Sequence, residues 1–263
     1  MTVKEIMNCI TEIAPLQWQE DYDNAGLQVG DVNAKVHKAL IALDVTEALV
    51  DEAIDKNCDL VISHHPLFFR GLKHLSPATE IERAVVKAVK HDIAIVSMHT
   101  NLDNSYLGVS RVLAERLGLT HLSILQPSAD HPEQCGAGMM GEFEEPMEEK
   151  EFLALVAERI GSPCLRYSAL TGRKVKKVGL CGGSGSPFIP DAVKNQVDAY
   201  LTADIKYHDF FAPDGVLLVD GGHFETEQFT KQLIKDLIQK KFPNFAAEIA
   251  ETNTNAVHYF CKK

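Results

Sequence analysis

One stretch of this sequence decides its fold: Leu60-Val61-Ile62-Ser63-His64-His65-Pro66-Leu67-Phe68-Phe69. Its apolar first half has the length of a buried strand, and Pro66 prevents that strand from continuing. Side chains alternate along a strand, so His64 and His65 can converge only where the chain turns. Adjacent imidazoles at such a turn are suited to binding one metal each, or two metals side by side. The alternative is a pair of loop histidines with no shared role.

The composition is that of a globular protein with an extensive core. The chain has 263 residues, of which 45% are hydrophobic and 24% charged. No apolar run approaches the roughly 20 residues needed to span a bilayer, and the N-terminus lacks a signal-peptide pattern. The six cysteines are scattered without a Cys-x-x-Cys pair, which favours reduced thiols and a cytoplasmic location. The net charge of −11 argues against nucleic acid as the main partner.

Strands and helices alternate along the chain. Besides the opening stretch, strands are expected at 38–43, 93–98, 175–180, 199–202 and 216–220, and helices at 47–56, 79–90, 106–117, 147–160 and 223–240. The buried stripe of the 79–90 helix is expected to be Ile81, Ala84, Val85, Ala88 and Val89. This order predicts an α/β protein with two α/β lobes and mainly parallel mixed sheets.

We place the boundary between the two lobes near residues 122–126. The first lobe then comprises residues 1–125, with the segment of about 229–263 packing back on it, and the second comprises residues 126–228. Ligands of open α/β sheets lie outside the C-terminal ends of the strands. We therefore expect a metal site between the lobes, at these strand ends.

Three strand ends carry side chains that bind metals. Besides His64-His65, these are His99-Thr100-Asn101-Leu102-Asp103 and the segment that begins at His223. His223 and Glu227 are four residues apart at the start of a helix, so they share one face. Asp103 has the alternative role of capping the following helix.

Taken together, three imidazoles and two carboxylates at strand ends match the ligand supply of a two-metal hydrolytic site. The ions of such sites lie roughly 3.5–4 Å apart. Mixed nitrogen and oxygen ligands suit zinc, iron, manganese or nickel, and the sequence leaves the choice open.

Five segments of the chain resemble motifs of the NIF three-like family, whose members are also named GTP cyclohydrolase 1 type 2 homologs. These segments are Ser63–Phe69, His99–Asp103, Gly221–Glu227, Asp23–Gly30 and Ala203–Asp209. They extend from near the N-terminus to the last long helix, so the resemblance covers essentially the whole chain. The chain resembles the short form of the family, without the additional mid-chain domain of many members.

The resemblance implies two divalent metal ions per subunit, bound by His64, His65, Asp103, His223 and Glu227, with Asp103 and Glu227 as bridging groups. It also implies a toroidal homohexamer, built as a trimer of dimers. The leading hypothesis is a metal-dependent hydrolase of a phosphorylated or nucleotide-like small molecule, like GTP cyclohydrolase 1 type 2. The alternative is a non-catalytic, metal-bound hexameric scaffold or regulatory protein that acts through protein partners.

Three neighbouring residues are candidates for supporting roles. His99 is expected to orient Asp103 rather than to bind metal directly. Lys206 and His208 are candidates for binding an anionic substrate or for acid–base catalysis; the alternative is a solvated surface pair. The Gly182–Gly185 loop can hold an anion on its backbone N–H groups or form a tight turn, and it lacks the Lys-Ser/Thr of a P-loop.

Overall fold

The chain forms two compact units in the computed structural model, which describes residues 1–211 and 215–260. Unit 1 comprises Met1–Leu102 and Thr230–Ala256, and unit 2 comprises Asp103–Phe229 and, at the end of the described chain, residues 257–260. Unit 2 is thus inserted into the sequence of unit 1. Each unit has its own mixed sheet with helices on its faces, and parallel strand pairs outnumber antiparallel ones in unit 1 but not in unit 2. The predicted fold class is confirmed.

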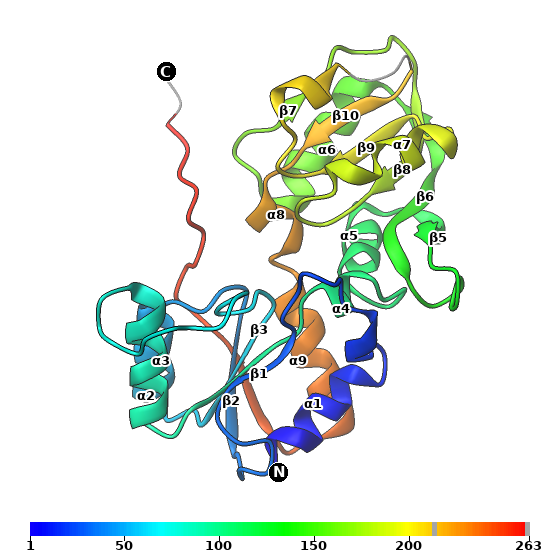
Figure 1. The fold of residues 1–263 in the computed structure, drawn as a ribbon. Helices are drawn as coiled ribbons and strands as arrows, with labels where there is room; N and C mark the ends of the chain where they lie inside the picture. Colours follow the sequence, from blue (N-terminus) through cyan, green and yellow to red (C-terminus); the bar gives the residue numbers. More distant parts are fainter. Residues whose placement is uncertain (212–214, 261–263) are drawn as a thin grey trace. The chain divides into compact units, whose positions relative to one another are not determined.

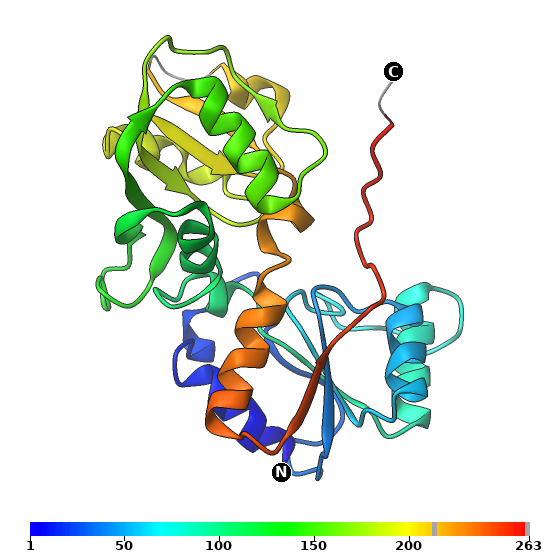
Figure 2. The ribbon, with the colours of Figure 1, turned by 180° about the vertical axis from the view of Figure 1, so that it is seen from behind.

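Unit 1 is built on a five-stranded sheet in the order β1-β4-β3-β2-β11 (Figure 1). Its strands are β1 (Gly26–Val29), β2 (Lys38–Ala42), β3 (Leu60–Ser63), β4 (Ala94–Ser97) and β11 (Ala246–Ile249). Only the β1–β4 pair is antiparallel among these described strands. Helices cover both faces of this sheet (Figures 1 and 2). They are α2 (Glu47–Asp55) and α3 (Glu80–Lys90) on one face, and α1 (Val3–Thr11) and α9 (Thr230–Lys241) on the other.

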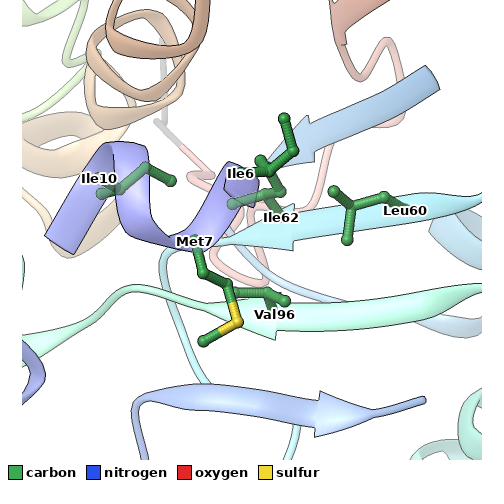
Figure 3. A pocket seen from close by; sticks show the side chains of 6 residues that line it. All are labelled: Ile6, Met7, Ile10, Leu60, Ile62 and Val96. Atoms are coloured by element: carbon green, nitrogen blue, oxygen red, sulfur yellow. The ribbon is translucent and has the colours of Figure 1, made fainter. Parts of the chain in front are cut away.

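Alternate residues of the strands in unit 1 face the two helix layers. Residues of β2, β3 and β4 that pack with α2 and α3 include Leu40, Val61 and Ile95. The neighbouring strand residues Leu60, Ile62 and Val96 face the other way. Figure 3 shows that they lie against Ile6, Met7 and Ile10 of α1. A sheet that is buried on both faces explains why its strands are nearly continuous apolar runs.

The buried stripe of α3 is narrower than predicted. It consists of Ala84, Val85 and Ala88, whereas Ile81 and Val89 are 40% and 57% exposed. The expectation that Ile81 and Val89 are buried was therefore wrong.

Unit 2 is built on a six-stranded sheet in the order β5-β6-β8-β9-β10-β7. The strands are β5 (Thr120–Pro127), β6 (Gly136–Met147), β7 (Arg166–Tyr167), β8 (Val175–Leu180), β9 (Ala199–Thr202) and β10 (Leu217–Asp220). Strands β8, β9 and β10 are parallel. Leu201 and Val219 pack with α5 (Val109–Leu117) and α6 (Glu149–Ile160), whereas Tyr200 and Leu218 pack with α7 (Ile189–Lys194). This sheet too is covered on both faces.

The chain enters unit 2 earlier than the expected boundary near residues 122–126. Helix α5 belongs to unit 2 because its Leu113 and Leu117 share a core with Phe152 and Val156 of α6. The segment expected to link the two lobes is itself the edge strand β5, which pairs with β6.

The single helix expected over residues 223–240 is two helices, α8 (His223–Glu227) and α9. The chain passes from unit 2 to unit 1 between them, at Phe229 and Thr230. Phe229 remains in unit 2, where the guanidinium of Arg116 lies 3.9 Å from the centre of its ring. The prediction of one helix was wrong because this segment must serve two separate cores.

None of the described helices is both long and apolar enough to cross a membrane. Among the described cysteines, Cys9, Cys58, Cys135 and Cys181 are buried free thiols, and Cys164 is an exposed one. Cys261 lies outside the described residues.

The segment after β11 is fastened to α2 through one carboxylate. Glu52 accepts hydrogen bonds from the backbone N–H groups of Glu251 and Thr252, each at 2.8 Å. The ammonium of Lys56 lies 3.0 Å from the same carboxylate. Burial raises the pKa of Glu52, but these hydrogen bonds outweigh it and lower the pKa to about 2.

We predict that Glu52 makes unit 1 sensitive to acid. Its folded pKa lies below the ordinary value of 4.5, so its stabilising contribution is present above that pH and is lost as pH falls towards 2. Glu52→Gln should lower the free energy of unfolding near neutral pH by an amount on the order of 2 kcal/mol. The difference from wild type should shrink below pH 4, in urea unfolding curves measured from pH 7 to pH 3.

A matched control is Glu158→Gln, which replaces an exposed carboxylate of α6. A constant difference between Glu52→Gln and wild type over the whole pH range would contradict this account.

Candidate metal centre

Three neighbouring parallel strands of unit 1 end in register. Ser63, the last residue of β3, pairs with the last residues of both β2 and β4. The segments that follow these strands therefore leave the sheet at the same edge. Those segments contribute Asp44, His64, His65 and His99.

The turn after β3 brings the paired histidines together. The hydroxyls of Ser63 and Ser97 both donate to the backbone carbonyl of His65, at 2.7 and 3.2 Å. The ring centres of His64 and His65 are 4.9 Å apart, and the ring of His99 lies 5.3 and 5.4 Å from them. We call these three residues the imidazole cluster. Each offers a ring nitrogen, all within 4.8 Å of one another, and together they could hold a metal ion.

Every ring of the imidazole cluster is held through its Nδ1 atom. The acceptors are the backbone carbonyl of Met98 for His64 at 2.8 Å, Asp44 for His65 at 2.6 Å and Asp23 for His99 at 2.8 Å. An oxygen acceptor at Nδ1 places the proton of the neutral ring there and makes Nε2 the metal-binding atom. The tautomer that metal binding requires is therefore set before any metal arrives.

Asp23 is a strong anchor for His99. It accepts hydrogen bonds from His99 and from the backbone N–H and hydroxyl of Thr100. Burial raises the pKa of Asp23, but these hydrogen bonds outweigh it and bring the pKa to about 2. The carboxylate is thus an anion at neutral pH. That His99 also orients Asp103 stays a prediction.

The strand ends of unit 2 also coincide. Thr202, at the end of β9, pairs with Asp220, at the end of β10, and Leu180 of β8 pairs with the residue before Thr202. The segments that follow leave this sheet at one edge and include Gly182–Gly185, Asp204 and His223.

Three predicted metal ligands of unit 2 lie together at this edge. His223 and Glu227 share one face of α8, with His223 Nε2 at 3.1 Å from a carboxylate oxygen of Glu227. A carboxylate oxygen of Asp103, the last residue of α4 (Thr100–Asp103), is within 4.8 Å of one of Glu227. We call Asp103, His223 and Glu227 the Asp–His–Glu cluster. As in unit 1, His223 donates from Nδ1 to an aspartate, Asp204, at 2.7 Å.

The Asp–His–Glu cluster attracts positive charge. Burial lowers the pKa of His223, but its hydrogen bonds with Asp204 and Glu227 outweigh this and raise the pKa to about 11. The hydrogen bond from His223 in turn lowers the pKa of Asp204. Next to the cluster, burial raises the pKa of the Cys181 thiol, and the charges of Asp103 and Glu227 raise it further. Cys181 therefore stays a neutral thiol, while the carboxylates are suited to a cation.

The glycine loop after β8 gives Glu227 its space. A Cβ atom at Gly183 would lie 2.1 Å from a carboxylate oxygen of Glu227 and 3.1 Å from His223 Nε2, and the φ angle of Gly183 is +61°. The N–H groups of Gly182, Gly183 and Gly185 donate to the hydroxyls of Ser110, Thr226 and Thr202. These three amides are committed within the protein, so the structure favours the tight turn over the anion site.

We predict that Gly183→Ala displaces Glu227. Gly172 is the matched control, because its φ angle is +74° and nothing lies within 4 Å of an added Cβ. Gly172→Ala should cost only the left-handed backbone penalty of about 1–2 kcal/mol. Gly183→Ala should cost at least about 1 kcal/mol more in the free energy of unfolding, because of the steric clash. Equal losses for the two variants in urea unfolding would show that Glu227 does not need this space.

Lys206 and His208 lie on the surface of unit 2, a short distance along the chain from Asp204. Lys206 precedes the 3-10 helix η3 (Tyr207–Phe210), and both side chains are exposed. The ring of His208 packs against Tyr207 at 5.3 Å and Phe211 at 6.4 Å between centres. Tyr207 and Phe211 are themselves 72% and 73% exposed, so this aromatic cluster is open to solvent in the single chain.

The three aspartates that hold the histidine rings were not among the predicted site residues. Asp44 and Asp204 both follow the end of a parallel strand by two residues, which is a signal that could have found them. Asp23 lies in a loop before β1 and was interpreted only as part of a turn and of a family motif. Its contact with His99 has no local signature.

The fold and these residues define a class: an α/β protein whose strand ends gather histidine and carboxylate ligands that could hold a metal ion. The oriented rings and the negative charge of the Asp–His–Glu cluster both fit such an ion. The chain belongs to the Duf34/NIF3 (NGG1p interacting factor 3) family, whose model matches residues 1–256. The resemblance stated from the motifs is thereby confirmed.

Known relatives extend over most of the chain. A protein of Clostridium acetobutylicum named GTP cyclohydrolase 1 type 2 homolog is 34% identical over 229 residues, covering 86% of this chain and 85% of its own length. A Streptococcus pneumoniae protein of the same name is 30% identical and covers 98% of this chain and 100% of its own. The crystal structure of Staphylococcus aureus protein SA1388 superposes with a TM-score of 0.92 at 29% identity, covering 99% of both chains.

Proposed function

We propose that this protein binds two divalent metal ions per subunit through His64, His65, Asp103, His223 and Glu227, with Asp103 and Glu227 as bridging groups. The observation that carries the proposal is the orientation of the imidazoles. His64, His65 and His223 each donate from Nδ1 to an oxygen within the protein. Such a bond to the far side of the ring is typical of histidines that bind metals.

The donor set suits zinc, iron, manganese or nickel. When bound, such ions polarise a scissile bond and bring the pKa of water towards neutrality. Imidazole nitrogens and carboxylate oxygens supply the ligands, and the negative charge of Asp103 and Glu227 offsets that of the cations.

Residues near the ligands would handle the substrate. We assign Lys206 and His208 to binding its anionic part, because both are exposed and lie only two and four residues beyond Asp204. In this role His208 also exchanges protons with the substrate. We assign His99 to orienting Asp103; its ring is held by Asp23 and lies beside the rings of His64 and His65.

The reaction that fits these residues best is hydrolysis of a phosphorylated or nucleotide-like small molecule. The names of the Clostridium acetobutylicum and Streptococcus pneumoniae relatives support a GTP cyclohydrolase 1 type 2-like activity within that class. We further propose that the protein is cytoplasmic and assembles as a toroidal hexamer, a trimer of dimers.

The exposed aromatic cluster favours a second candidate function. Tyr207, His208 and Phe211 form a solvent-facing group of rings, and exposed apolar groups of this kind often mark protein interfaces. A metal-bound hexameric scaffold or regulator would use such a surface for protein partners. The family description as an interacting factor agrees with this alternative.

We predict that the purified wild-type protein holds two metal ions per chain and hydrolyses at least one member of a panel of phosphoesters, nucleotides and cyclic amides. His65→Ala and Glu227→Ala should each lower metal content, measured by atomic emission. Each should reduce turnover by at least about 100-fold, because losing a ligand exceeds the cost of losing a group that orients one. The hexamer, measured by light scattering, should survive.

His91→Ala is the control, since His91 is an exposed residue at the end of α3. Full metal content without turnover of any substrate would favour the scaffold. Wild-type protein that remains metal-free in metal-replete buffer would contradict the site itself.

A further inference from the structure

The segment that follows β11 reaches the imidazole cluster of unit 1. Two backbone N–H groups of this segment donate to Glu52, as described above. Further along the segment, the hydroxyl of Thr254 donates to Oδ2 of Asp44 at 2.8 Å. The other oxygen of the same carboxylate, Oδ1, accepts the hydrogen bond from His65 Nδ1 at 2.6 Å. One carboxylate thus joins a residue near the C-terminus to a histidine at the end of β3.

The hydroxyl of Thr254 limits how the carboxylate of Asp44 can turn. The terminal torsion of an aspartate side chain is broad, so one hydrogen bond leaves the carboxylate plane free to rotate. Hydrogen bonds to both oxygens, from two different segments, hold that plane. Asp44 needs this support because its side chain is 34% exposed, whereas that of His65 is 17% exposed.

We propose that Thr254 is a positioning residue for His65 and acts through Asp44. This inference rests on the proposed function, because it concerns a ligand of the proposed metal centre. Thr254 touches neither the metal nor the substrate in this role. It fixes the carboxylate that fixes the imidazole, so that Nε2 of His65 points in one direction.

The size of the expected effect follows from the order of these contacts. Removing a group that directly holds a metal ligand costs about 10–100-fold in metal affinity. Thr254 stands one hydrogen bond further out, so its loss should cost no more than about tenfold, at the low end of that range. Asp44→Ala removes the direct partner and sets the upper limit.

The deciding experiment measures Co²⁺ affinity by competition with a chelator, together with the visible absorption of the bound Co²⁺. Thr254→Val keeps the shape of the side chain and removes the hydroxyl, whereas Thr254→Ser keeps the hydroxyl. Thr254→Val should weaken Co²⁺ binding by about threefold to tenfold and shift its spectrum. Thr254→Ser should restore both.

Thr252→Val is the matched control, since Thr252 belongs to the same segment and contacts Glu52 rather than Asp44. A second readout needs no metal: the Nδ1 proton of His65, followed by NMR, should exchange with water faster in Thr254→Val than in wild type.

Two outcomes would overturn the inference. If Thr254→Val binds Co²⁺ as wild type does and leaves the exchange of the His65 proton unchanged, the inference fails and the proposed function stands. If Thr252→Val weakens binding as much as Thr254→Val does, the segment acts by general anchoring and the hydrogen-bond relay is wrong. Wild-type protein that binds no Co²⁺ would overturn the proposed function as well.

Discussion

An imidazole presents one nitrogen to a metal only when its other nitrogen carries the proton, and this chain meets that condition at four histidines. In each ring, Nδ1 donates to an oxygen: a backbone carbonyl for His64 and aspartates for His65, His99 and His223. The aspartates need an ordered place of their own. The register of the parallel strands aligns their ends, and the loops that follow these ends hold the aspartates in place.

The parts of the centre that could be predicted from the sequence are those marked by a local pattern. His64 and His65 end an apolar run of strand length, and His223 and Glu227 have helical spacing, so their positions at strand and helix ends followed from periodicity. Distant partners leave no such trace. The contact of His65 with Asp44 joins residues 21 positions apart, that of His99 with Asp23 joins residues 76 apart, and that of Thr254 with Asp44 joins residues 210 apart.

The same limit explains the errors in the predicted fold. The apolar positions of residues 223–240 continue through α8 and α9, so a period alone cannot show that the two helices serve separate cores. Residues 120–127 lack a strong strand pattern because they form the mostly exposed edge strand β5. The central strands of both sheets, buried on both faces, were correctly predicted because burial alone accounts for their composition.

The insertion of unit 2 into unit 1 has a consequence for the order in which a ribosome would complete the two units. Unit 2 is nearly continuous in sequence, whereas the sheet of unit 1 is closed by β11, which is made only after residues 103–229. Until then, strand β2 presents an unpaired edge, which is the kind of surface that aggregates. Asp44 also lacks Thr254 throughout this interval. The imidazole cluster should therefore mature after residues 103–229 of unit 2, and a stall in translation during this interval would leave it incomplete.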